Sequence, residues 1–185
     1  MSGISIIGRY QDTIIWPSIH GGSLKQEVRP WAKNQVQDSA LKVIAGSVCR
    51  LDEATTPELG YYASLPIRYM KLGSGDASWD SLQDPATAEK DVAATTLLNT
   101  THTIQFTADD LYLLDANGNL TSLPSNRFGG VVTLDTTIVG DLREFGLFGG
   151  QAGGNMFNWV SHALIQKDNT TTIQRAFDIQ IDIVR

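Results

Sequence analysis

Large apolar and polar residues alternate in short stretches over most of the chain, which predicts a protein made mainly of β-strands. In the clearest stretch, 171–184, aliphatic and aromatic residues fall on one strand face, while Asp178, Gln180 and Asp182 fall on the other. Similar stretches cover 67–72, 100–107, 111–114 and 128–139. Strands at such short spacing, separated by turn signals, indicate an antiparallel β-sandwich of the jelly-roll-like kind.

Two further strands are predicted within 142–168, the stretch around which the rest of the chain is organised. The run LREFGLF carries large apolar groups at nearly every second position and ends at Gly149-Gly150. After Gly153-Gly154 the chain resumes with apolar and aromatic residues from Met156 onward. Glycines interrupt strands, so this pattern is typical of two long core strands joined by a glycine-rich turn.

The N-terminal part follows other patterns. Residues 1–24 are expected to form an extended N-terminal arm with short strands, which either folds back on the core or reaches onto a neighbouring subunit. Apolar residues at three- and four-residue spacing then predict one amphipathic helix at about 30–47, with Pro30 at its first position. The predicted division is therefore the arm 1–24 and a single β-sandwich domain, 25–185.

Glycine and asparagine mark the predicted turns. Asn117-Gly118 is a strong hairpin signal, and Gly129-Gly130 inside a strand suggests a β-bulge. Gly73 and Gly75 are expected to let the chain leave a strand sharply, and Gly146 to leave room for a neighbouring ring or backbone. The polar stretch 81–94 reads as a surface loop.

Composition narrows the possible partners. The chain has 185 residues, enough for a substantial core, and a net charge of -6 with its 14 basic residues scattered, which argues against nucleic acid. No apolar run approaches the ~20 residues that span a bilayer, and the first residues lack a signal-peptide pattern, so synthesis in a cytoplasm and no membrane partner are expected. Cys49 is the only cysteine, which excludes an intrachain disulfide.

Candidate chemistry is sparse. His20, His102 and His162 are far apart in sequence and lack metal-ligand spacing, and no G-x-S-x-G nucleophile motif occurs. We therefore predict no catalytic, cofactor-binding or metal-binding residue and no enzymatic activity. Asp109-Asp110 is expected to lie in a turn between strands.

Two loops resemble ligand sites without meeting their requirements. The segment 115–119 resembles the start of a calcium loop, but Leu120 and Asn126 occupy the positions where an EF-hand needs glycine and glutamate. The Gly-Ser-Gly of 73–75 could suggest a phosphate cradle, but it leads into Asp76 and Asp80 rather than into a lysine and a helix. A hairpin turn explains 115–119 better, and a sharp turn at the end of a strand explains 73–75 better.

Three features carry a family resemblance: the predicted helix, which ends before a loop, and two segments. One is the strand IRYMKL of 67–72 with the following Gly-Ser-Gly and Trp79-Asp80, and the other is LREFGLF, with the Lys167-Asp168 turn further on. Over about 30–184 the chain resembles structural proteins of tailed bacteriophages, including tail-fibre and baseplate-associated proteins. The stretch 151–155 is longer and richer in glycine than in that family.

The resemblance implies a virion structural protein, made in the host cytoplasm, that acts as a tail, baseplate or fibre-adaptor component by self-assembly and docking. Its expected partners are copies of itself, as a trimer or hexamer, and other virion proteins. One alternative is a capsid decoration (cement) protein. A second is a carbohydrate-binding module that presents Tyr61, Tyr62, Trp79 and Asp80 in exposed loops to a host-surface glycan.

Overall fold

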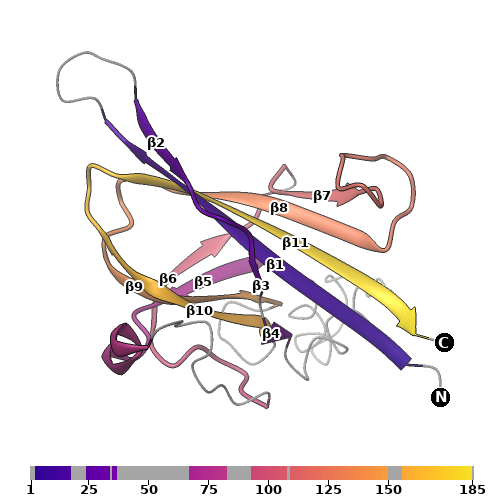
Figure 1. Cartoon of the computed structure of the whole chain (residues 1–185), viewed down its shortest axis with the longest axis horizontal. Coiled ribbons are helices and arrows are strands. Elements are labelled where there is room, and N and C mark those ends of the chain that lie inside the picture. Colours follow the sequence, from indigo (N-terminus) through magenta and orange to yellow (C-terminus); the bar gives the residue numbers. More distant parts are fainter. Residues whose placement is uncertain are drawn as a thin grey trace, which may run out of the picture. The chain divides into compact units, whose positions relative to one another are not determined.

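Two antiparallel β-sheets form most of the described structure, so the predicted mainly-β class is confirmed (Figure 1). The computed structural model describes residues 3–17, 24–33, 35–36, 67–82, 93–107, 109–149 and 156–184. The chain divides into two compact units. The first unit comprises Met1–Asn34, Thr107–Gly140 and Gln166–Arg185, and the second comprises Gln35–Phe106 and Asp141–Ile165. The division into an arm, 1–24, and one domain, 25–185, remains a prediction.

The sheet of the first unit joins the two ends of the chain. Its strand order is β2-β1-β11-β8-β7, with β3 also paired to β1. The strands are β1 (Gly3–Trp16), β2 (Lys25–Val28), β3 (Ala32–Lys33), β7 (Leu111–Leu114), β8 (Arg127–Leu134) and β11 (Thr172–Val184). In Figure 1, β1 and β11 run side by side along their length.

The segment expected to form an N-terminal arm contains one long strand instead of two short ones. β1 pairs antiparallel with β11 from Gly3 opposite Val184 to Ile15 opposite Thr172. Of the two placements considered, this pairing corresponds to folding back onto the same chain. Tyr10 and Ile14 of β1 are buried beside Phe177 and Ile173 of β11, as expected for strands with one buried face.

One position pair on this buried face is charged. Asp12 lies directly opposite Arg175, and the two side chains are 1% and 0% exposed. Arg175 donates from Nε and Nη2 to the two carboxylate oxygens of Asp12, each at 2.7 Å. This bidentate geometry is the favourable one for a guanidinium and a carboxylate, and it lets both charges lie away from water.

The sheet of the second unit has the strand order β4-β10-β9-β5-β6. Its strands are β4 (Gln35–Val36), β5 (Tyr69–Gly73), β6 (Thr100–Gln105), β9 (Gly140–Phe148) and β10 (Met156–Lys167). The two long strands predicted within 142–168 are confirmed as the neighbours β9 and β10. A buried cluster beside them contains Trp79, Leu97, Phe148, Met156 and Trp159.

The helix predicted at about 30–47 is wrong wherever the structure describes that segment. Ala32–Lys33 forms β3 and pairs with Arg9 and Tyr10, while Gln35–Val36 forms β4 and pairs with Asn158 and Trp159. Ladder hydrogen bonds to β1 and β10 outweigh the weak local helix preference of these residues. Residues 37–47, which carry most of the helical spacing, lie outside the described residues, as does Cys49.

The bulge predicted at Gly129-Gly130 is also wrong. β8 pairs with β11 in continuous register from Leu134 to Arg127. Instead, the two glycines are needed because Phe177 packs too close to leave room for a Cβ at either position. A Cβ at Gly130 would overlap the ring of Phe177, and one at Gly129 would lie 2.7 Å from the carbonyl oxygen of Phe177.

The Lys167-Asp168 turn between β10 and β11 is held by its own side chains. Asp168 accepts hydrogen bonds from the backbone N–H and hydroxyl groups of both Thr170 and Thr171, at 2.8–3.0 Å. These bonds lower the pKa of Asp168 from 3.8 to about 2. Lys167 Nζ, buried at 3% exposure, donates to the carbonyl oxygens of Asp135 and Thr171, and burial lowers its pKa.

The buried ion pair of the first unit should be sensitive to loss of one partner and tolerant of loss of both. Arg175→Met leaves the carboxylate of Asp12 buried without its counter-ion, so we expect the free energy of unfolding to fall by about 3–5 kcal/mol. The double variant Asp12→Leu with Arg175→Met should recover most of that loss. Urea denaturation of the four proteins measures this coupling, and additive single losses would contradict it.

The Asp168 turn should contribute to acid sensitivity. Because the folded pKa is depressed, the carboxylate stabilises the fold at pH above 3.8, and this contribution is lost as the pH falls to about 2. We expect Asp168→Asn to be less stable than the natural protein at neutral pH, with the difference shrinking over that interval. Urea denaturation at stepped pH measures the difference, and a carbon-13 NMR titration should give a pKa near 2 for this carboxyl. A constant difference down to pH 2 would contradict the assignment.

Candidate functional site

The two segments that carry the family resemblance meet in the second unit. β5 ends at Gly73, which pairs directly with Glu144 of β9. A Cβ at Gly73 would lie 2.5 Å from Glu144 Oε1 and 2.7 Å from the carbonyl oxygen of Asn99, so the close approach requires glycine. We call Gly73, Gly75, Asp80, Arg143 and Glu144 the clasp, because they fasten the loop after β5 onto β9.

Glu144 is the buried centre of the clasp. Its side chain is 0% exposed and accepts three hydrogen bonds. Oε1 accepts from the backbone N–H of Asn99 at 2.9 Å, and Oε2 accepts from the N–H of Leu98 at 3.2 Å and the indole N–H of Trp159 at 2.8 Å. These donors fix the carboxylate in place and tie the chain before β6 to β9 and β10.

Arg143 closes the other side of the clasp. Its Nε and Nη2 donate to the two carboxylate oxygens of Asp80, each at 2.8 Å, and Nη1 donates to the carbonyl oxygen of Ser74 at 3.2 Å. The hydrogen bond from Arg143 lowers the pKa of Asp80. Asp76 accepts from the N–H of Ser78 at the start of a short 3-10 helix, Ala77–Ser81, and this bond lowers the pKa of Asp76.

Trp79 packs inward from that short helix. It is only 8% exposed, and its ring lies 6.4 Å from the ring of Trp159, centroid to centroid. Gly75 has a φ of +56° and faces this ring so closely that a Cβ would overlap it. The expectation that Trp79 presents an exposed face for sugar stacking is therefore wrong, and Asp80 is engaged by Arg143. Tyr61 and Tyr62 lie outside the described residues.

The structure gives local roles to the other residues considered from sequence. His102 of β6 contacts the hydroxyl of Thr101 at 3.0 Å, and the buried His162 of β10 contacts the carbonyl oxygen of Ala163 at 2.8 Å. His20 lies outside the described residues. Asp110 accepts from the N–H and hydroxyl of Thr107, as expected for a turn residue.

The hairpin turn predicted at Asn117-Gly118 is confirmed. Asp115 Oδ1 accepts from the N–H groups of Asn117 and Asn119, each at 2.8 Å, and these bonds, with that of Asn119 first, lower the pKa of Asp115. Gly118 has a φ of +88°, which suits glycine. Asp115, the carboxylate that resembled a calcium ligand, therefore stabilises the turn in which it lies.

Among the described residues, no group of three or more histidine, cysteine, aspartate or glutamate side chains is placed to hold a metal ion. The same residues contain no helix of sufficient length and apolar character to cross a bilayer.

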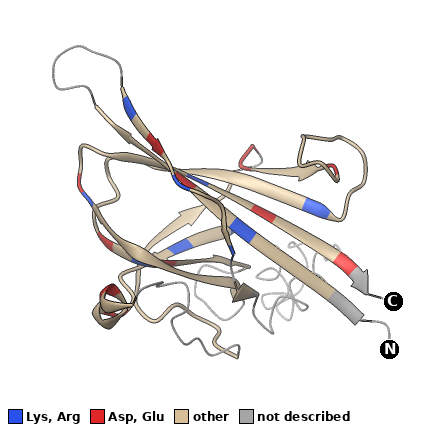
Figure 2. Cartoon of the chain, viewed as in Figure 1, with Lys and Arg blue, Asp and Glu red and all other residues tan. Residues whose placement is uncertain are grey.

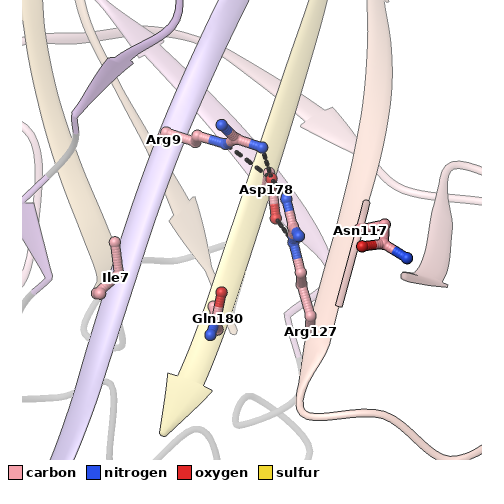
Figure 3. Close-up of a pocket in the computed structure, with 6 residues that line it drawn as sticks. All are labelled: Ile7, Arg9, Asn117, Arg127, Asp178 and Gln180. Carbon is pink, nitrogen blue, oxygen red and sulfur yellow. Dashed lines mark hydrogen bonds and ion pairs between the residues drawn. The ribbon is translucent and has the colours of Figure 1, made fainter. Parts of the chain in front are cut away.

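A pocket on the first unit was not anticipated from sequence. It opens on the polar face of the sheet, the side opposite to buried Phe177, and has a volume of about 350 Å³. Its lining residues come from β1, β8, β11 and the turn between β7 and β8, and Figure 3 shows them as sticks. The lining residues are Ile7, Arg9, Asn117, Arg127, Asp178 and Gln180.

Two arginines share one carboxylate in this pocket. Arg9 Nε donates to Asp178 Oδ2 at 2.8 Å, while Arg127 donates from Nε to Oδ1 at 2.8 Å and from Nη2 to Oδ2 at 2.5 Å. Burial acts to raise the pKa of Asp178, but the hydrogen bonds from Arg127 and Arg9 outweigh it and lower that pKa. Figure 2 shows the charge pattern, with basic bands on β1 and β8 beside acidic bands on β11.

Register explains how these three side chains meet. Arg9 is directly opposite Asp178, and Asp178 is opposite Gly129 on β8, which in turn is opposite Tyr112 on β7. The bare glycine keeps this row free of a side chain between Asp178 and Tyr112. Burial, and after it the charge of Asp178, raises the pKa of Tyr112. In sequence, only the outward positions of Arg9 and Asp178 on alternating strands could have pointed to the pocket.

The described structure is mainly β. Its carboxylates chiefly accept hydrogen bonds from backbone N–H groups and from arginines. No protein-family model, curated protein or solved structure matches this chain.

Removing the clasp carboxylate should destabilise the second unit. Glu144→Ala leaves three donors without their acceptor, and hydrogen bonds to a charged group contribute ~1.5–3 kcal/mol each without being additive, so we expect a loss of about 3 kcal/mol. Glu144→Gln keeps one acceptor oxygen and should lose less. Urea denaturation followed by tryptophan fluorescence measures this, with Thr103→Ala, at an exposed position on β6 of the same unit, as the control. A Glu144→Ala protein as stable as that control would contradict the assigned role.

Proposed function

We propose that this chain is a bacteriophage virion structural protein, a tail, baseplate or fibre-adaptor component that acts by self-assembly and docking without catalysis. One observation carries the proposal. The residues behind the resemblance, from Gly73 to Asp80 and from Arg143 to Phe148, meet in a clasp whose charged groups bind each other and the backbone. Such an arrangement favours a scaffold role for the motif.

Exposed apolar side chains at the sheet edges support association. β2 and β7 are the outer strands of the first unit's sheet. On or next to β2, Leu24 and Val28 are 66% and 58% exposed, and in the turn after β7, Leu120 and Leu123 are 72% and 70% exposed. Large apolar groups beside edge strands favour contacts with another chain, because both the edge and the side chains gain from being covered.

The finer parts of the proposal stay predictions. We expect a trimer or hexamer, since closed rotational symmetry satisfies a repeated interface in every copy. The jelly-roll-like sandwich stays a prediction about how the two sheets pack. A capsid decoration protein is the alternative with the same assembly chemistry, and it differs in its place on the particle, which antibody labelling in electron microscopy distinguishes.

Self-association should be measurable on the purified protein. We expect light scattering after size-exclusion chromatography to give three or six times the chain mass. Leu120→Asp combined with Leu123→Asp should shift the protein to monomer, because two carboxylates would be buried at the interface. Val139→Asp, at a 46% exposed valine of the same unit outside β2 and β7, is the control for an added surface carboxylate.

The virion assignment has its own measurement. Mass spectrometry of particles purified from the producing host should detect the chain at a fixed ratio to other virion proteins. A natural protein that is monomeric and never copurifies with particles would contradict the proposal. If the chain copurifies with particles and also binds sugars on a glycan array, the results would favour an adaptor that also contacts the host surface.

A further inference from the structure

The polar-face pocket of the first unit brings two arginines and one aspartate together. Asp178 receives three hydrogen bonds from guanidinium groups, and Arg127 alone contacts both of its oxygens. Two guanidinium charges against one carboxylate leave one positive charge unbalanced among the lining residues. Asp115 also acts on Arg127, but its carboxylate is exposed and is occupied by N–H groups of its own turn.

Arg9 carries the available charge. Its side chain is 45% exposed, and its guanidinium lies 4.6 Å from the centre of the Trp31 ring. Asp178 holds it from one side and Trp31 supports its plane, so the group is oriented before any ligand arrives. Its Nε and Nη2 both contact Asp178 Oδ2, at 2.8 and 2.7 Å, so the N–H groups left for the two oxygens of a ligand carboxylate are those of Nη1 and the second one of Nη2.

Two carboxamides complete the lining. Gln180 donates from Nε2 to Asp182 at 2.9 Å, which leaves its Oε1 as an acceptor. Asn117 makes no side-chain hydrogen bond within the described part of the chain, so its amide can both donate and accept. Ile7, which is 54% exposed, adds an apolar surface. A ligand with hydroxyl groups could hydrogen-bond to these two amides, and an apolar face of its ring could pack on Ile7.

We propose that the pocket binds one acidic sugar unit of the uronic acid class. Its carboxylate would contact Arg9 and Arg127, its hydroxyls Asn117 and Gln180, and its ring Ile7. The lining residues carry an excess of only one positive charge, and the carboxylates of Asp182 and Asp115 lie close to Gln180 and Arg127, so a monovalent carboxylate suits the pocket better than a phosphate dianion. The volume of about 350 Å³ accommodates a ring, whereas an acidic peptide side chain would leave most of it empty.

Ligand titrations followed by proton–nitrogen NMR test this on the full chain. Glucuronate supplies carboxylate and hydroxyls, glucose only hydroxyls, acetate only the carboxylate, and a tetraglutamate peptide the competing class of partner. We expect glucuronate to bind at least tenfold more tightly than the other three and to shift the Arg9 Nε–H signal. Equal or weaker binding of glucuronate than of glucose, acetate or the peptide would overturn the proposal.

Variants identify the site. Arg9→Gln should weaken glucuronate binding about tenfold, because it removes one charge-assisted contact while Arg127 still satisfies Asp178. Arg29→Gln, at a partly exposed arginine of the same unit outside the pocket lining, should bind normally. Asn117→Ala, in the turn, should weaken binding about threefold and gives a second test should Arg9→Gln misfold. Unchanged affinity in both pocket variants would overturn the proposal, and this result would leave the assembly prediction untouched.

Discussion

The first and last long strands are locked in register by two ion pairs of opposite orientation on opposite faces. Asp12 of β1 binds Arg175 on the buried face, and Arg9 of β1 binds Asp178 on the polar face. A shift by two residues would place Asp12 opposite Ile173 or Phe177 and bury it without a counter-ion, while a shift by one would exchange the faces. The apolar residues alone do not discriminate so sharply, since isoleucine recurs along both strands. The pocket depends on this register, because its lining includes residues of both strands.

The second unit uses buried charge in a similar way, with backbone as the partner. Glu144 receives N–H groups from the chain before β6 and from Trp159, and Arg143 holds Asp80 and a carbonyl oxygen. A buried charge is tolerated only with its hydrogen bonds satisfied, so each such group selects one arrangement of the segments around it. In the described networks, charge therefore acts mainly to specify structure.

Local pattern predicted the strands well and their long-range partners poorly. The alternation at 171–184 and the hairpin signal at Asn117-Gly118 depend on neighbouring residues, and both are confirmed. The helix prediction failed at Ala32–Lys33 because pairing with β1 is invisible in local spacing. The bulge at Gly129-Gly130 failed because the glycines make room for Phe177, which is distant in sequence. The clasp and the pocket were missed as sites since each joins segments that only the completed sheet brings together.

Arg9 differs from the other arginines of these networks in what the fold requires of it. Arg175 alone supplies the hydrogen bonds described for Asp12, and Arg143 those for Asp80, so loss of either leaves a carboxylate without that partner. Asp178 already has a bidentate partner in Arg127, and Arg127 also holds the carbonyl oxygen of Ala116. Arg9 is thus one of two partners of its carboxylate, and it is the most exposed of these four side chains. Because Arg127 stays paired with Asp178, the guanidinium of Arg9 can contact a ligand without leaving that carboxylate unpaired.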